Sequence, residues 1–123
     1  MKKLVILCQL VAAIILLQTL YFKFTGAPES IWIFSTLGAE PIGRWGSGMI
    51  ELIAATLILV PLTKVWGALL IMGTMAGAIL SHIFILGIEV QGDGGTLFAL
   101  ACVAFVCAAI VGHSDRERLL KMF

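Results

Sequence analysis

Charged residues are scarce in this sequence, and those that occur form no dense run of one sign. Lys, Arg, Asp and Glu make up 12% of the 123 residues, and the formal net charge at pH 7 is +1. A protein that binds nucleic acid needs clustered Lys or Arg to neutralise phosphates. We therefore expect no nucleic-acid partner.

Cysteines and catalytic motifs are also few. Cys8, Cys102 and Cys107 lie in apolar segments without CxxC or metal-ligand spacing, which excludes disulfide-exchange chemistry and predicts that the thiols pack as small apolar groups. Nucleophile-elbow, P-loop and dinucleotide-binding fingerprints are missing. No H-x-x-x-H or E-x-x-H spacing is present to indicate a catalytic metal. We expect no metal site.

Apolar residues, in contrast, are abundant at 61% of the chain, more than the core of a soluble domain this size can bury. The first apolar run is longer than a signal-peptide core and is followed by no small-residue cleavage site, so we interpret it as a retained span. The sequence therefore predicts one all-α integral membrane domain over residues 1–123, a four-helix bundle. Four runs are long enough to cross about 30 Å of hydrocarbon as helices: Leu4 to Phe22, Trp45 to Leu62, Val65 to Ile88, and Thr96 to Gly112.

The longest connection, between the first two spans, contains "SIWIFSTL" after a Pro-Glu-Ser start and predicts a short helix lying in the membrane interface. Lys23 and Arg44 are the only basic residues that flank the spans on this side of the predicted bundle. Because Lys and Arg resist translocation, the basic residues on the opposite side place both termini in the cytoplasm. Those residues are Lys2, Lys3, Lys64, Arg116, Arg118 and Lys121.

Small residues predict where the helices touch, since membrane helices associate through close backbone approach. Gly73-x-x-x-Gly77 forms one such stripe on the third span. Ala104-x-x-x-Ala108-x-x-x-Gly112 forms another on the fourth.

Ionisable side chains lie unusually deep in two of the spans. At 1.5 Å per residue, Glu51 is about 10 Å from the outer end of the second span, and His82 is about 9 Å from the outer end of the third. Because a charge at this depth is costly, Glu51 is expected to face the bundle interior and to pair with Lys23, Arg44 or His82. We take Lys23, Arg44, Glu51 and His82 as the candidate polar pocket.

Two interpretations of this cluster remain open. It is either a binding pocket or a structural network of ion pairs that locks the helices together. For His82 alone, the simplest alternative is a neutral ring hydrogen-bonded to a carbonyl or to Glu51. Three other acidic residues, Glu29, Glu40 and Glu89, are expected to be solvated at the interface, and Asp93 is expected to cap the fourth span.

A narrow apolar cavity with an acid, a base and one or two cations suits an amphipathic molecule whose head carries oxygens. A quinone is the first candidate ligand, because His82 or Lys23 could donate to its carbonyl and Glu51 could exchange the proton that accompanies electron transfer. Arg44 would hold Glu51 ionised or bind an anion. A lipid headgroup or a sulfur oxyanion also suits this arrangement.

The chain resembles the DoxX family of small four-helix bacterial and archaeal membrane proteins. The similarity lies in "FKFTG", "LGAEPIGRWGSGMIELIAATLILVP", "AGAILSHIFILG" and the "GDGG" turn, which together extend over nearly the whole chain. It implies a multi-pass protein of the prokaryotic inner membrane, in a family whose members are described as parts of quinol oxidase, thiosulfate:quinone oxidoreductase or stress-linked oxidoreductase systems. The residues carried over are Lys23, Arg44, Glu51 and His82.

The sequence thus supports three functional hypotheses. The first is a quinone-associated subunit of a membrane oxidoreductase; since haem, flavin and iron–sulfur signatures are missing, its electrons would come from a partner protein. The second is a non-catalytic scaffold or assembly subunit. The third is a transporter or lipid-handling protein, which would need a homo-oligomer because four short helices leave little room for alternating access.

Overall fold

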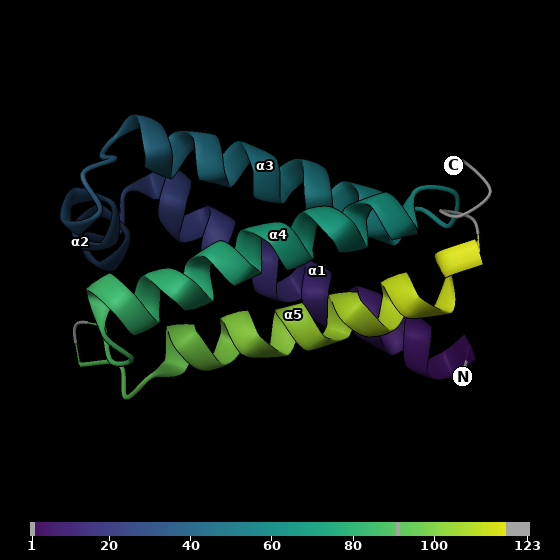
Figure 1. Cartoon of the computed structure of the whole chain (residues 1–123). Helices are drawn as coiled ribbons and strands as arrows, with labels where there is room; N and C mark the ends of the chain where they lie inside the picture. The colour runs from purple at the N-terminus through teal and green to yellow at the C-terminus, as the bar shows by residue number, and fades with distance from the viewer. Residues whose placement is uncertain (1, 91, 118–123) are drawn as a thin grey trace.

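The computed structural model describes residues 2–90 and 92–117, which form four long helices and one short one (Figure 1). The four long helices are long and apolar enough to cross a membrane, and the short helix α2 lies between the first two. The predicted all-α four-helix bundle is confirmed. The elements are α1 (Lys2–Thr25), α2 (Pro28–Thr36), α3 (Ile42–Leu59), α4 (Lys64–Ser81), a π-helical turn η1 (His82–Leu86) and α5 (Thr96–Ser114).

The long helices pack in a closed ring, in which α1 contacts α3 and α5 while α4 contacts the same two helices from the other side (Figure 1). The beginning of α1, the α3–α4 turn and the end of α5 lie at one end of the bundle, and α2 lies at the other. Lys2, Lys3, Lys64 and Arg116 are therefore separated from Lys23 and Arg44, as predicted. Arg118 and Lys121 lie outside the described residues.

Small side chains allow the helices to approach closely. Ala104 and Ala108 on α5 are fully buried, and a Cβ on Gly112 would lie 3.7 Å from the Cβ of Ala68 on α4. The predicted contact stripe on the last span is confirmed. Cys8 belongs to the same core and Cys107 packs against it, as expected for small apolar groups.

The prediction for the Gly73-x-x-x-Gly77 stripe is wrong within this chain. A Cβ added at either glycine would meet no atom within 4 Å, so no other helix packs closely against either one. The glycine that permits close packing is instead Gly67, where a Cβ would lie 2.4 Å from the backbone nitrogen of Ile58 on α3. The spacing of small residues at every fourth position identifies a helix face that carries small residues, but it does not show whether another helix covers that face.

The helix ends differ by a few residues from the predicted spans, and two of the differences have a local cause. Helix α3 ends at Leu59 rather than Leu62, because Val60 precedes Pro61 and takes an extended conformation (φ −91°, ψ 124°). The third span is not one α-helix to Ile88. It becomes a π-helical turn at His82 and stops at Gly87, whose φ of +86° suits a residue without a side chain.

Candidate functional site

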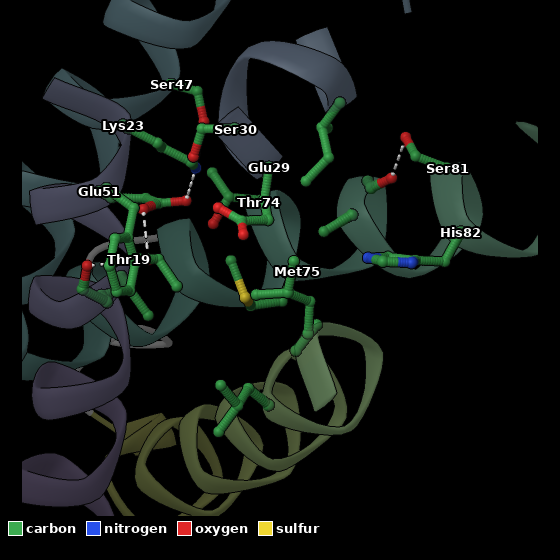
Figure 2. A pocket seen from close by; sticks show the side chains of 18 of the residues that line it. Thr19, Lys23, Glu29, Ser30, Ser47, Glu51, Thr74, Met75, Ser81 and His82 are labelled. Atoms are coloured by element: carbon green, nitrogen blue, oxygen red, sulfur yellow. Dashed lines mark hydrogen bonds and ion pairs between the residues drawn. The ribbon is translucent and has the colours of Figure 1, made fainter. Parts of the chain in front are cut away.

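A cavity of about 620 Å³ lies at the α2 end of the bundle, between the four long helices and beneath α2 (Figure 2). We call it the α2 pocket. Its wall is mainly apolar, and polar side chains are spaced around it. Three of the four predicted site residues, Lys23, Glu51 and His82, line this pocket, and the fourth, Arg44, does not.

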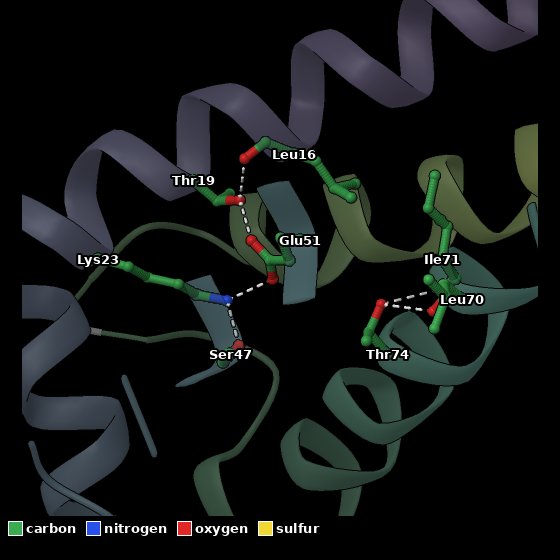
Figure 3. A network of polar contacts seen from close by, with 8 residues as sticks. All are labelled: Leu16, Thr19, Lys23, Ser47, Glu51, Leu70, Ile71 and Thr74. Carbon is green, nitrogen blue, oxygen red and sulfur yellow. Dashed lines mark hydrogen bonds and ion pairs between the residues drawn. The ribbon is translucent and has the colours of Figure 1, made fainter. Parts of the chain in front are cut away.

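Glu51 and Lys23 form a buried ion pair between α3 and α1 (Figure 3). The Lys23 ammonium donates to Glu51 Oε1 and to the Ser47 hydroxyl, the latter at 2.8 Å. The Thr19 hydroxyl lies 3.1 Å from Glu51 Oε2 and 2.9 Å from the Leu16 carbonyl oxygen. Glu51 is only 2% exposed. The expectation that this carboxylate faces the interior and finds a cationic partner is confirmed.

The ammonium group of Lys23 retains some capacity to bind. It carries three N–H donors, of which Glu51 and Ser47 use two. Its Nζ also lies 5.6 Å from the centre of the Phe34 ring of α2. No described residue accepts a hydrogen bond from the third donor.

Arg44 has a different role from the predicted one. Its Nε lies 3.0 Å from both carboxylate oxygens of Glu40, its Nη2 lies 2.9 Å from Glu40 Oε1, and its Nη1 donates to the Lys23 carbonyl. Glu40 lies in the turn just before α3, and carbonyls in the last turn of α1 lack helical partners. Arg44 thus neither pairs with Glu51 nor reaches the pocket. Glu40 is consequently not the solvated charge that the sequence predicted.

His82 lies in the π-helical turn and is 5% exposed. Its Nδ1 is 3.0 Å from the Gly87 carbonyl oxygen, and its ring meets Phe98 edge to face at 5.7 Å between centroids. A carbonyl only accepts hydrogen bonds, so Nδ1 carries a hydrogen. In the neutral ring, Nε2 is then an acceptor, and it has no hydrogen-bond partner in the part of the chain that the structure describes.

Glu51 and His82 do not meet directly. Figure 2 shows them on opposite sides of the α2 pocket, and no hydrogen bond or ion pair joins them among the described residues. Counting residues from the helix ends predicted the same depth for both side chains. The Gly87 carbonyl, however, lies nearer to the His82 ring than Glu51 does, and it is the hydrogen-bond partner. Of the alternatives for this residue, the bond to a carbonyl is the one found.

Two acidic residues line the pocket without having been predicted to do so. Glu29 points into it from α2 (Figure 2). Asp93 lines it from just before the start of α5. The Pro-Glu-Ser start predicted the helix α2 but not that it folds over the end of the bundle. The hydrophobic pattern of a sequence indicates which residues share a helix, but it does not indicate where a segment between helices packs.

Asp93 caps α5 as predicted, but from two residues before Gly95, which occupies the N-cap position. Its Oδ2 accepts from the Leu97 N–H at 3.1 Å, and its Oδ1 accepts from Gly95 at 2.8 Å and from Val90 at 3.0 Å. Burial raises the pKa of this carboxyl, but these backbone N–H groups and the electrostatic effect of His82 together hold the pKa below its usual 3.8. The ionised form is therefore the one that stabilises the loop.

We expect Asp93→Ala to lower the free energy of unfolding by about 1 kcal/mol, as for loss of a helix cap. Because the folded pKa lies below the unfolded value, this stabilisation is complete above the unfolded pKa and is lost as the pH falls through the folded pKa. Thermal unfolding in detergent from neutral pH down to about pH 3 should show the two proteins converging in acid. A difference that stays constant with pH would contradict a role for the carboxylate charge.

Within residues 2–90 and 92–117 no group of three or more His, Cys, Asp or Glu side chains could hold a metal ion. Comparison with known proteins adds no assignment, since no family model, curated protein or solved structure matches this chain. The resemblance to the DoxX family therefore remains a hypothesis from the sequence. Conclusions about function depend on the geometry of the site.

Proposed function

We propose that the α2 pocket binds the head of a quinone or quinol, and that the chain is a quinone-associated subunit of a membrane oxidoreductase system. The observation that carries this proposal is one largely apolar cavity in which an N–H donor of Lys23 and an acceptor of His82 are free on separate walls. A volume of about 620 Å³ is in the range of small-molecule sites. The resemblance to the DoxX family supports the same function and a place in the prokaryotic inner membrane with cytoplasmic termini.

The pocket favours an uncharged ligand over an anion. Glu29, Glu51 and Asp93 supply three carboxylates to its wall, whereas Lys23 supplies the one ammonium group among the described lining residues. A sulfur oxyanion or an anionic headgroup would face net repulsion there. A quinone is neutral in both its oxidised and its reduced two-proton forms, so it avoids this cost.

The ligand would enter from the hydrocarbon. Phe22, Ile50 and Gly77 line the pocket and are also exposed on the sides of α1, α3 and α4, where lipid surrounds a membrane helix. A lipid-soluble molecule can then reach the polar groups without crossing water. This access suits a quinone tail better than it suits a water-soluble substrate.

The hydrogen-bonding capacity of the walls defines the role of each residue. Lys23 donates to a ligand carbonyl, and Glu51 holds the ammonium in position. In its neutral form the His82 ring accepts from a quinol hydroxyl through Nε2, rather than donating to a carbonyl as the sequence suggested. Oxidation of a bound quinol would release two protons and two electrons. The His82 ring takes one proton, and the Asp93 carboxylate is placed to offset its charge; the Glu29 carboxylate takes the other proton, and both electrons pass to a redox partner protein.

Binding of a short-tailed benzoquinone and of its quinol to the purified protein in detergent tests the proposal. Glu51→Gln and His82→Ala are each expected to weaken binding by about tenfold. The first loses the ion pair that positions the Lys23 donor, and the second loses an acceptor for the ligand. His82→Ala should weaken quinol binding more than quinone binding, because the neutral ring only accepts at Nε2.

Glu117→Gln and His113→Ala provide matched controls, since both residues are exposed at the opposite end of the bundle. The controls should bind like the wild type. If the double variant Glu51→Gln/His82→Ala binds quinone and quinol as the wild type does, the α2 pocket is not the site.

A second candidate function, a scaffold or assembly subunit, is favoured by a different observation. Every cation at this end is held by the chain itself: Lys23 joins α1 to α3, and Arg44 joins the start of α3 to the end of α1. For a scaffold, Glu51→Gln should lower thermal stability in detergent while a respiratory or stress phenotype survives at matched protein levels. For a quinone-binding subunit, the phenotype should be lost at the same protein level.

A further inference from the structure

A second cavity, of about 380 Å³, lies at the opposite end of the bundle from α2. We call it the terminal pocket. Its residues come from the start of α1, the α3–α4 turn, the first residue of α4 and the end of α5. They are Lys2, Val5, Ile6, Gln9, Pro61, Lys64 and Ser114.

The terminal pocket holds two cations without a counterion. Lys2 and Lys64 form no ion pair within the described ranges, and no carboxylate lines the cavity among these residues. Both ion pairs of the described chain, Lys23–Glu51 and Arg44–Glu40, lie at the α2 end. Each of the two lysines is also the first residue of its helix, where the helix dipole is positive and adds to the unfavourable potential. An external anion would relieve this repulsion.

The other walls indicate what kind of anion fits. Gln9 is 8% exposed, and its amide nitrogen donates one hydrogen to the Ile58 carbonyl at 2.7 Å, leaving the second hydrogen free. Val5 and Ile6 provide an apolar wall, and Ile6 is 52% exposed on the side of α1. The cavity thus combines two ammonium groups and an amide with an apolar surface that continues toward the lipid.

From this arrangement we infer that the terminal pocket binds an anionic phosphate group between Lys2 and Lys64. The group would come from a membrane lipid headgroup or from free phosphate. Lysines at the ends of membrane helices attract anionic headgroups, and basic pockets between such helices hold them. The apolar wall of Val5 and Ile6 would contact the first carbons of an acyl chain if the source is a lipid. This site is separate from the α2 pocket, and the inference does not depend on a quinone.

Native mass spectrometry of the full chain in detergent, with phosphatidylglycerol, phosphatidylcholine or inorganic phosphate added, tests the inference. Each lysine near the membrane surface contributes about fivefold to the affinity for an anionic lipid, so Lys2→Gln/Lys64→Gln should weaken phosphatidylglycerol binding by about twenty-five-fold. The matched control is Lys3→Gln/Arg116→Gln, which removes the same charge from residues at the same end that do not line the cavity. Circular dichroism would verify that both variants fold.

The outcomes separate the two sources of phosphate. Retention of phosphatidylglycerol over phosphatidylcholine, lost in the pocket variant and kept in the control, supports the site with a lipid as its occupant. Binding of inorganic phosphate with the same dependence on Lys2 and Lys64 supports the site with free phosphate as its occupant. Equal losses in the pocket variant and the control, or no loss in either, would overturn the inference.

Discussion

Lys23→Met is expected to lower the free energy of unfolding by about 3 to 5 kcal/mol, the range measured when one partner of a buried ion pair is removed. The partner of Lys23 is Glu51. The Glu51 side chain is 3% exposed and the Lys23 side chain 14%, so solvent can screen the carboxylate that remains in the variant only weakly. Methionine keeps the length and apolar stem of lysine, and the loss therefore reports on the charge. Unfolding in mixed detergent micelles would measure it.

A double variant separates the charge from the shape of the site. Lys23→Met/Glu51→Gln removes both charges, so most of the lost stability should return, because no uncompensated ion remains in the bundle. Lys3→Met is the control, since Lys3 is exposed at the other end and should change stability by less than about 0.5 kcal/mol. A loss of less than about 1 kcal/mol for Lys23→Met would show that the pair is effectively solvated.

Gly67→Ala is the second change with a large expected effect. The new Cβ would lie 2.4 Å from the nitrogen and 2.8 Å from the Cα of Ile58, so the backbones of α3 and α4 must move apart. Overpacking of this kind costs about 1 to 3 kcal/mol, which exceeds the gain of up to about 1 kcal/mol from the higher helix propensity of alanine. The net result should be a lower unfolding midpoint in detergent.

Gly73→Ala on the same helix is a close control. No atom lies within 4 Å of its new Cβ, so the change should be neutral or stabilising through helix propensity alone. If both variants lose stability equally, the loss comes from the flexibility of α4 and not from its contact with α3. A lower midpoint in Gly67→Ala alone supports the close approach of the two backbones.

The fold and part of the candidate site could be predicted from the sequence for one physical reason. A helix has a fixed rise per residue, so counting from the ends of apolar runs placed Glu51, His82 and Lys23 in the same part of the bundle. All three line one cavity. The cost of a charge in hydrocarbon then required a partner for Glu51, which Lys23 provides.

The features that the sequence did not predict depend on how each helix is rotated about its axis and on where the connecting segments pack. Counting residues along a helix determines neither. Arg44 lies on nearly the same face as Glu51, but Glu40 and a carbonyl at the end of α1 lie nearer to it. The π-helical turn that begins at His82 brings the Gly87 carbonyl to its ring, which a regular helix would not do. Gly73 and Gly67 look equally suited to close packing in the sequence, and only the assembled bundle distinguishes them.

The π-helical turn makes the segment after Ser81 sensitive to its own length. The backbone carbonyl of His82 accepts from the Gly87 N–H at 2.8 Å, and the His82 ring donates to the Gly87 carbonyl at 3.0 Å, so two bonds span five residues. Such turns contain one residue more than an α-helical turn of the same rise. Deleting a single residue between His82 and Gly87 would convert the segment to ordinary helix and rotate Gly87 relative to the imidazole by roughly a quarter turn, with the hydrophobic length nearly unchanged. In this segment the number of residues, rather than their hydrophobicity, determines which groups the His82 ring can reach.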